Sequence, residues 1–248
     1  MVLLIQRPPD LKNPEIPDRT NQLLGLLPEL ELQNLLVSSE RIILPAKQNL
    51  HKFNEPIEQV YFPLQGIISL VNTSEDGLSA EVATVSNEGM IGIAGFLGGN
   101  ISASLAITRT TCTAISIPVN VFRRESTNGK KLQRILLLYT QALLTKVSRN
   151  VFCSCHHTLE QRLARWLLSY SDRLHGKTLL LTQETLADLL GVRRSSLSVV
   201  AVDFKQRNLI RYNRGRVTII NYEGLKQVSC RCERSISREY TRLLNCFL

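Results

Sequence analysis

Residues Leu181–Leu209 read LTQETLADLLGVRRSSLSVVAVDFKQRNL, and this stretch decides the fold of the C-terminal part of the chain. Thr182 is a typical helix N-cap, and apolar residues follow it at helical spacing as far as Leu190. Gly191 then ends the helix, because a tight turn favours a residue that tolerates positive φ. A second helix starts at once with 193–196, RRSS. The pattern predicts two helices joined by a tight turn.

The second helix begins with long cations and small hydroxyls, which reach phosphates and base edges when a helix N-terminus enters a major groove. Residues 211–216 (RYNRGR) and 217–220 (VTII) then predict a hairpin with a basic tip, a wing that contacts the DNA backbone. An ordinary helical hairpin with a solvated basic end is the alternative. The agreement of turn glycine, polar helix start and basic hairpin favours a DNA-binding helix-turn-helix. The candidate DNA-binding residues are Thr182, Gln183, Arg193, Arg194, Ser195, Ser196, Ser198, Arg214 and Arg216.

The positive charge is concentrated in the same part of the chain. The 248 residues carry a net charge of +9. Residues 160–248 contain 16 Lys and Arg against 8 Asp and Glu, whereas residues 1–159 contain 14 against 13. This distribution indicates a nucleic-acid-binding domain joined to a nearly neutral domain.

The sequence contains no apolar run long enough to cross a membrane, and the apolar start 1–5 is too short for a signal peptide. We therefore expect a cytoplasmic protein without membrane contact. Its six cysteines are then expected to be thiols rather than disulfides.

The N-terminal half is predicted to be a small β domain. Residues 1–18 contain four prolines among charged residues and are predicted to form a flexible arm. Residues 20–36 predict one or two short helices, broken at Pro28. Short β-rich runs separated by turn residues predict an antiparallel barrel or jelly roll. These runs are 41–44, 59–62, 66–71, 80–85 and 106–117.

A long helix is predicted between the two domains, with Asn128 as its N-cap and its end near Thr158. Apolar residues recur at steps of three and four, and 135–139 is continuously apolar or aromatic. Such a helix buries one stripe in its own domain and another against a partner. A single-chain core helix is the alternative. A further helix is predicted at 159–174, and the tail 223–248 is expected to be helical and basic.

The order of barrel, long helix and winged helix-turn-helix resembles the Crp/Fnr family of bacterial transcription regulators. The resemblance covers nearly the whole chain after about residue 20, and its motifs are 181–209, 161–168 (QRLARWLL) and 57–66 (IEQVYFPLQG). It implies an α+β fold with a flexible arm (1–18), a cyclic-nucleotide-binding-like β jelly-roll sensor domain (19–127), a central dimerisation helix (128–158) and a winged helix-turn-helix DNA-binding domain (159–248). It further implies a homodimer on a pseudo-palindromic operator, with RNA polymerase as an expected partner. Arg194 matches the family arginine that contacts guanine. Val199 stands where the best-known family members have a further polar or cationic residue that contacts bases.

The sensor pocket departs from the family pattern. Family members that bind cyclic nucleotides use a glycine–glutamate pair and a downstream arginine; here Gly92 fits, but Ile93 replaces the glutamate. Ala103, or Ser102 under a one-residue shift, replaces the arginine. A buried phosphate without a cation would lose its charge-assisted hydrogen bonds. We therefore expect no cyclic nucleotide and no other cofactor. The glycines of this segment could form an anion-binding nest, but barrel-corner geometry is favoured.

The segment 153–157 (CSCHH) is the only metal-like cluster in the sequence. Cys153, His156 and His157 would share one helix face, and Cys230, Cys232 or a second chain could add a fourth ligand. Cysteines also serve as small core residues, and helix-end histidines often cap carbonyls. We therefore expect no metal, and keep a metal- or redox-responsive regulator using Cys153, Cys155, His156 and His157 as the alternative.

Two other functional classes give different expectations. A protein-interaction module with secondary DNA binding is an alternative that would show little preference for a specific duplex over a random one. The chain contains no P-loop, no helix-borne pair of metal histidines around a glutamate and no nucleophile elbow, so no enzyme activity is expected.

Overall fold

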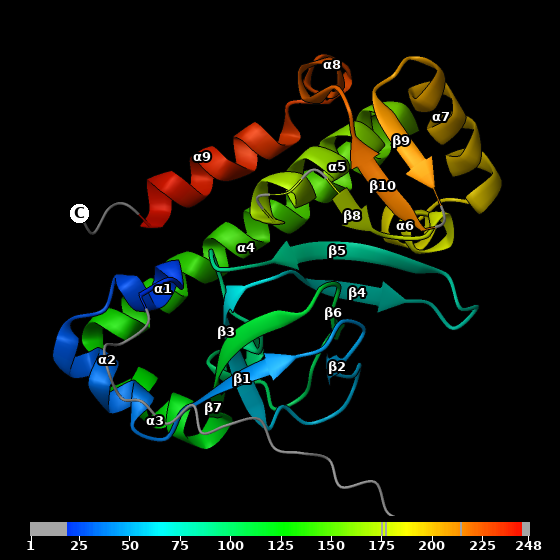
Figure 1. Ribbon diagram of the computed structural model, residues 1–248. Helices are drawn as coiled ribbons and strands as arrows, with labels where there is room; N and C mark the ends of the chain where they lie inside the picture. Colours follow the sequence, from blue (N-terminus) through cyan, green and yellow to red (C-terminus); the bar gives the residue numbers. More distant parts are fainter. Residues whose placement is uncertain (1–18, 175, 177, 214, 245–248) are drawn as a thin grey trace, which may run out of the picture.

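The computed structural model describes residues 19–174, 176, 178–213 and 215–244 (Figure 1). The predicted arm, 1–18, and the candidate site residue Arg214 lie outside the described residues. A β-rich domain, a long helix and a second, mainly helical domain follow one another along the chain. This is the mixed α and β architecture that the sequence predicts.

The N-terminal domain is built on two antiparallel sheets, with strand orders β1-β7-β3 and β2-β6-β4-β5. The strands are β1 Glu40–Leu44, β2 Asn49–His51, β3 Gln59–Gln65, β4 Ile68–Thr73, β5 Ser79–Val85, β6 Leu105–Thr108 and β7 Cys112–Pro118. Small and branched apolar side chains such as Ile68, Val85 and Ala114 fill the interior. The predicted strand at 106–117 is two strands, β6 and β7. The strand β2 was not predicted, and it has only three residues.

Three helices and the start of the long helix cover one side of this domain: α1 Gln22–Gly25, α2 Glu29–Leu36 and α3 Val119–Asn128 (Figure 1). The buried Asn21 caps α1 by accepting from the backbone N–H of Leu23 at 3.0 Å. Its amide group also donates to the carbonyls of Pro63 and Gly89. One side chain thus starts a helix and ties it to the barrel.

The long helix α4, Lys130–His156, has 27 residues and a length of about 40 Å. The predicted start is wrong: Asn128 is the last residue of α3, and a break at Gly129 precedes α4. The carboxylate of Glu31, on α2, accepts from the backbone N–H of Leu132 at 2.9 Å. A residue distant in sequence therefore satisfies this positive helix end, and no local pattern could show it.

The second domain surrounds a core of leucines and aromatic residues that includes Leu167, Leu197 and Phe204. Its elements are α5 Leu159–Leu174, β8 Thr178–Leu180, α6 Gln183–Leu190, α7 Arg194–Gln206, β9 Ile210–Asn213, β10 Arg216–Ile219, α8 Tyr222–Val228 and α9 Cys232–Leu244. The strands form one sheet of order β8-β10-β9, so the predicted hairpin gains a third strand.

The tail is helical as predicted as far as residue 244: it forms α8 and α9, and α9 runs back along α4 (Figure 1). The second domain also packs directly on the barrel, because Ile67 of the barrel is fully buried within its core. Across the described residues, no helix has the length and apolar character that a membrane span requires.

Candidate functional site

The start of α7 is presented to solvent. The N-cap Thr182 begins α6 by accepting from the backbone N–H of Thr185 at 3.1 Å, and Gly191 ends it with φ of 61°. After the turn, residues 193–196 are all exposed. The opposite face of α7 is anchored by Leu197 and Phe204, both 0% exposed. The two predicted arginines and two serines therefore project from a helix end whose other face is fixed in a core.

Two further predicted residues, Gln183 and Ser198, are joined to each other. The Ser198 hydroxyl donates to Oε1 of Gln183 at 2.9 Å, and both side chains are half-buried. Their bond links the first turn of α6 to the second turn of α7. The pair sets the angle between the two helices and leaves part of each side chain accessible.

The wing lies beside the start of α6. A Cβ atom at Gly215 would lie 3.6 Å from Cγ2 of Thr182, so the hairpin tip and this helix end are neighbours. Arg216 is exposed, as predicted for a backbone contact. A concavity of about 470 Å³ is lined by Arg211, Asn213, Arg216 and Thr218.

Arg211 is a basic residue that the sequence-based site omitted. It lies on β9, opposite Thr218 of β10 in the strand register, and lines the same concavity as Arg216. Cross-strand pairing brings side chains of two strands to one face. The hairpin prediction already contained this signal, because positions 211 and 213 alternate with the half-buried Tyr212.

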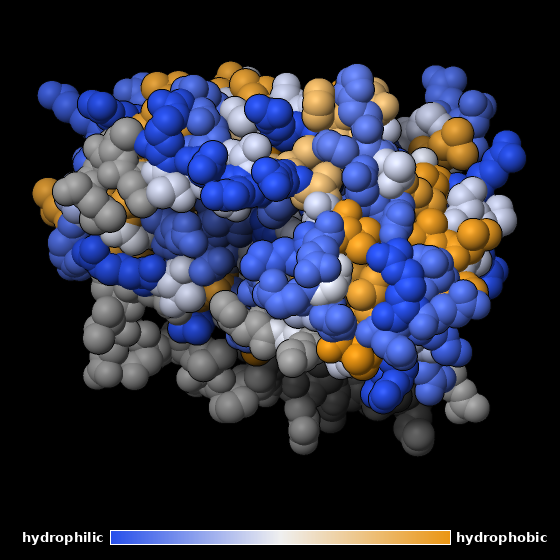
Figure 2. Space-filling view, turned by 90° about the horizontal axis from the view of Figure 1, so that it is seen from above, coloured by the Kyte–Doolittle hydropathy of each residue, from blue (hydrophilic) through white to orange (hydrophobic). Residues whose placement is uncertain are grey.

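The surface on this side is not uniformly polar. Figure 2 views the molecule from above and shows hydrophobic side chains among hydrophilic ones at the end that carries α7. Val199 and Val202 of α7 are 71% and 53% exposed. Exposed methyl groups on a groove-reading helix suit contact with the methyl group of thymine.

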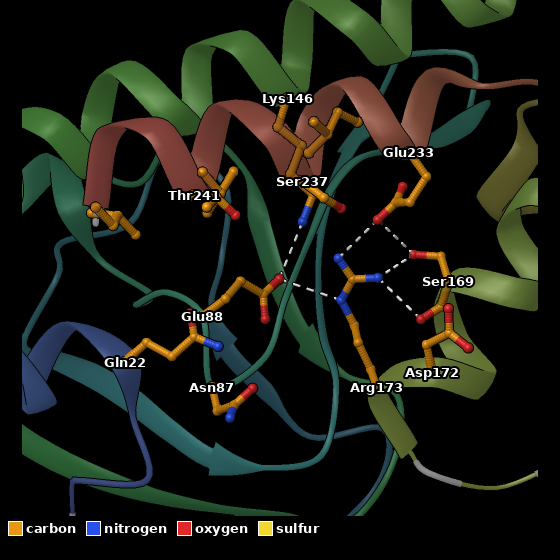
Figure 3. A pocket seen from close by; sticks show the side chains of 13 residues that line it. Gln22, Asn87, Glu88, Lys146, Ser169, Asp172, Arg173, Glu233, Ser237 and Thr241 are labelled. Atoms are coloured by element: carbon orange, nitrogen blue, oxygen red, sulfur yellow. Dashed lines mark hydrogen bonds and ion pairs between the residues drawn. The ribbon is translucent and has the colours of Figure 1, made fainter. Parts of the chain in front are cut away.

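A polar pocket of about 420 Å³ lies where α4, α5 and α9 meet the barrel (Figure 3). Arg173 is at its centre: Nε lies 3.3 Å from Glu88 and an Nη lies 3.2 Å from Glu233. Lys146 of α4 lies 3.3 Å from the same Glu88 oxygen and also donates to the carbonyl of Thr84. Two cations and two carboxylates from four segments therefore balance one another in a largely buried site.

The charged side chains in this pocket shift one another's pKa values. Burial alone would raise the pKa of Glu88, but Arg173 and Lys146 more than offset it and lower that pKa to about 2. Burial and the neighbouring Arg173 lower the pKa of Lys146. The carboxylate of Glu88 is thus charged at neutral pH and holds the barrel to α4 and α5.

A second contact joins the barrel to the second domain through Glu81 of β5. Its carboxylate accepts from Nε1 of Trp166 at 3.1 Å and from the hydroxyl of Tyr170 at 2.8 Å. Ser69 of β4 donates to the same carboxylate. The helix α5, which leads into the helix-turn-helix, is therefore hydrogen-bonded to a barrel strand.

Comparison with known proteins agrees with this architecture. A family model described as a cyclic nucleotide-binding domain matches residues 41–127, and one described as a Crp-like helix-turn-helix domain matches residues 161–228. A putative transcriptional regulator of the Crp/Fnr family from Eubacterium rectale shares the fold with a TM-score of 0.71 and 16% identity, over 85% of this chain and 98% of that one. The chain belongs to the Crp/Fnr family. It is a DNA-binding transcription regulator of that type.

This Crp/Fnr regulator also resembles curated cyanobacterial proteins. It is 22% identical to the global nitrogen regulator of Synechococcus elongatus over 70% of this chain and 82% of that protein. It is equally 22% identical to the global nitrogen regulator of a Nostoc strain, over 66% of this chain and 78% of that protein. FixK2 from Bradyrhizobium japonicum has the same fold, with a TM-score of 0.66 and 15% identity over 77% of this chain and 98% of that one.

The sensor segment of this Crp/Fnr regulator is built as a barrel corner. Gly92 has φ of 94° and starts a short 3-10 turn, Ile93–Gly95. Ile93 packs against the apolar core rather than presenting a polar group. Arg123 of α3 donates to the carbonyl of Gly95 at 2.8 Å and to Asn100 at 2.6 Å. Arg123 thereby holds the glycine-rich loop in place.

The two candidate replacements for the family arginine lie differently. Ala103 is exposed, whereas Ser102 is buried and donates to the carbonyl of Ser104 at 2.8 Å. The Ser102 hydroxyl is therefore already engaged with the backbone.

The predicted Cys/His cluster is only partly brought together. His156 is exposed and stacks on Phe152 with ring centroids 4.6 Å apart, and Cys155 is also exposed. The predicted common face of Cys153, His156 and His157 is therefore wrong, because α4 ends at His156 and the backbone becomes extended at His157. Cys153 and His157 instead meet Cys230 and Cys232.

Proposed function

We propose that this regulator acts as a homodimer that binds a pseudo-palindromic operator, with the start of α7 in the major groove of each half-site. The observation that carries this proposal is the exposure of residues 193–196 at the end of an anchored helix. The wing beside Thr182 adds a basic surface for the DNA backbone.

The dimer is proposed to form along α4. Leu137, Leu144 and Val151 are 54%, 65% and 60% exposed and recur at intervals of seven residues. The half-buried Val147 lies between the last two. An apolar stripe of this period on a long helix fits a coiled-coil seam with an identical helix. A two-fold axis along the seam would place the two recognition helices about 34 Å apart, which is one turn of DNA.

Selection of bound sequences from random duplexes, with purified full-length protein, tests the operator. The expected result is an inverted repeat whose half-site centres are 10–10.5 base pairs apart. Enrichment of single half-sites, or of no sequence, would contradict the proposal.

Mapping of the sites bound in the cell identifies the target genes. Growth on different nitrogen sources is the first condition to compare, because the curated relatives are nitrogen regulators. Sites adjoining promoter elements would support RNA polymerase as a partner.

The sensor domain is proposed not to bind cyclic nucleotides. Ile93 is apolar and packs against the core, and Ser102 is bonded to the backbone, so neither supplies the ribose or phosphate contact of the family pattern. Calorimetry with cyclic AMP and cyclic GMP is expected to show no binding at millimolar or lower concentration. Micromolar affinity for either nucleotide would contradict this. Ala103→Arg alone is expected not to create binding, because Ile93 would leave the ribose hydroxyl unpaired.

A further inference from the structure

Four metal-ligating side chains meet where the end of α4 approaches the start of α9. Cys153 lies in the last turn of α4, and His157 directly follows that helix. Cys230 lies in the connection between α8 and α9, and Cys232 is the first residue of α9. The Cys153 and Cys230 sulfurs are 3.5 Å apart, and the Cys232 sulfur is 3.6 Å from Nδ1 of His157. All four ligand atoms lie within 4.8 Å of one another.

These separations match one tetrahedral metal ion. With Zn–S of about 2.3 Å and Zn–N of about 2.0 Å, tetrahedral geometry places neighbouring ligand atoms roughly 3.5–3.8 Å apart. The two shortest contacts already have that length, and the remaining pairs need only small side-chain rotations. A [4Fe–4S] cluster binds each protein ligand to a different iron, and a [2Fe–2S] cluster binds two ligands on each of its two irons, so both spread their four ligands further apart than a single ion does.

The surroundings also suit a closed metal site. The three cysteines are each less than 9% exposed and His157 is half-buried, so four protein ligands would complete the coordination without an open position. Three thiolates with one divalent ion leave a net negative charge. Arg162 and Arg165 of α5 interact electrostatically with Cys153 and Cys230 and offset that charge.

Arg165 provides a second, independent observation. Its Nε is buried and has no hydrogen-bond partner among the described residues, although its Nη1 donates to Asn150 at 3.0 Å. An unpaired buried N–H donor is costly. Arg165 also interacts electrostatically with Cys153 and Cys230, so its positive charge favours thiolate ligands at these positions.

We propose that Cys153, His157, Cys230 and Cys232 bind one structural Zn²⁺ ion in each chain. Thiolate and imidazole ligands in tetrahedral arrangement select zinc over harder divalent ions. The ion crosslinks the end of the dimerisation helix to α9 and fixes the path of α9 along α4. This revises the expectation of no metal, and it replaces Cys155 and His156 of the sequence-based cluster with Cys230 and Cys232.

Elemental analysis of the full-length protein, purified under reducing conditions without chelator, is the first test. We expect one zinc ion per chain. Replacement by Co²⁺ should give the intense visible bands of a tetrahedral site and a thiolate-to-cobalt charge-transfer band. Absence of stoichiometric metal, both as purified and after reconstitution with Zn²⁺ or Co²⁺, would overturn the proposal.

Variants identify the ligands. His157→Ala and Cys232→Ser should reduce the zinc content to background, whereas His157→Cys should retain zinc because four thiolates also bind it. Cys155→Ser and His156→Ala are matched controls, since both residues are exposed neighbours, and they should keep one ion per chain. Retention of zinc in His157→Ala and Cys232→Ser, or its loss in both controls, would contradict the assignment even if some variants fold poorly.

Two other outcomes would also overturn it. A Cys153–Cys230 disulfide that is present even after purification under reducing conditions, detected by mass spectrometry of peptides, would indicate a redox pair instead. Iron together with acid-labile sulfide would indicate a cluster. A zinc site would remain in the protein even if no specific operator were found, so this test is independent of the proposed function.

Discussion

At the residue scale, we expect different arginines to read bases and to bind the DNA backbone. Arg194 is the first residue of α7, where a guanidinium can form two hydrogen bonds with guanine. Arg216 lies on the wing, beside the concavity that also contains Arg211. Both arginines are exposed, as these predicted roles require. Arg211 lay within the predicted hairpin, and strand pairing places it on the same concavity as Arg216.

Arg194→Ala is expected to cost about 1–3 kcal/mol of binding free energy on the cognate site and to flatten the preference at one base pair per half-site. Random duplex should be bound nearly as before. Titration of both duplexes by fluorescence anisotropy measures the two affinities. Equal weakening on cognate and random DNA would show that α7 does not lie in the groove as proposed.

Arg216→Ala is the matched comparison on the wing. Removing a phosphate contact should weaken cognate and random duplex alike and lower the slope of log K against log salt by about one per half-site. The same is expected of Arg214→Ala, because the sequence predicts a backbone contact for this residue too. A loss confined to the cognate duplex would instead assign base reading to the wing.

The buried ion pair of Glu88 makes stability dependent on pH. The pKa of Glu88 is about 2 in the folded protein and about 4.5 in its unperturbed state. A lowered pKa stabilises the folded state above pH 4.5, and this contribution is lost as pH falls from about 4.5 towards 2. Glu88→Gln should therefore destabilise the protein at pH 7 and reduce the loss of stability across that acidic range.

Urea unfolding at pH 3, 5 and 7 measures this difference. Glu55→Gln is the control, because Glu55 forms an exposed ion pair with Lys52 and should change stability little at any of these pH values. If Glu88→Gln lost as much unfolding free energy between pH 5 and pH 3 as the parent protein does, the assigned role of the pocket would be contradicted.

At the scale of elements, the turn between α6 and α7 contacts the sensor barrel. Gly191 has φ of 61°, and a Cβ there would lie 3.3 Å from Cβ of Ala80 on β5. Glu81 on the same strand binds Trp166 and Tyr170 of α5. One barrel strand, β5, therefore contacts both α5 and the turn between α6 and α7. A movement of β5 would act directly on the helix-turn-helix.

Gly191→Ala should destabilise the folded protein by more than the roughly 1–2 kcal/mol that a left-handed conformation costs an L-residue, because the new methyl group also presses on Ala80. Gly77→Ala is matched in conformation, with φ of 80°, but has open space around it. Equilibrium unfolding of both variants separates the two effects. Equal losses would show that the turn does not press on the barrel.

At the scale of the whole molecule, α4 lies in three different environments along its length. Its start packs in the barrel core through residues such as Leu136 and Tyr139, and Lys146 joins the polar pocket. Its outer face carries the exposed stripe that includes Leu144. This division explains why its sequence is apolar on more than one face, as the continuous run at 135–139 indicates.

Leu144→Lys should convert the proposed dimer to monomer at micromolar concentration, because two like charges would face each other across the two-fold seam. Sedimentation velocity measures the change, and affinity for the full operator should fall with it. Leu78→Lys is the control: this leucine is also strongly exposed, at 74%, but lies on the β4–β5 turn. A Leu144→Lys protein that sediments like the parent would place the interface elsewhere.

The sequence by itself determined the features that depend on neighbouring residues. The N-cap Thr182, the turn at Gly191 and the exposed start of α7 are local signals, since capping and positive φ act within one turn of chain. Helical and alternating periodicities similarly predicted α5 and most barrel strands. Asn128 was misplaced because a good cap residue also fits the last turn of the preceding helix.

Only the tertiary structure decided which distant groups meet. Cys153 contacts Cys230 across 77 positions of sequence, and Leu132 is capped by Glu31 across 101. Lys146 is one of several cations on α4, yet it is buried against Glu88. Such pairings depend on how helices pack against sheets, which a local periodicity does not specify. The pairings of Lys146 and Leu132 exist because a buried charge or helix end is costly until packing brings a partner to it.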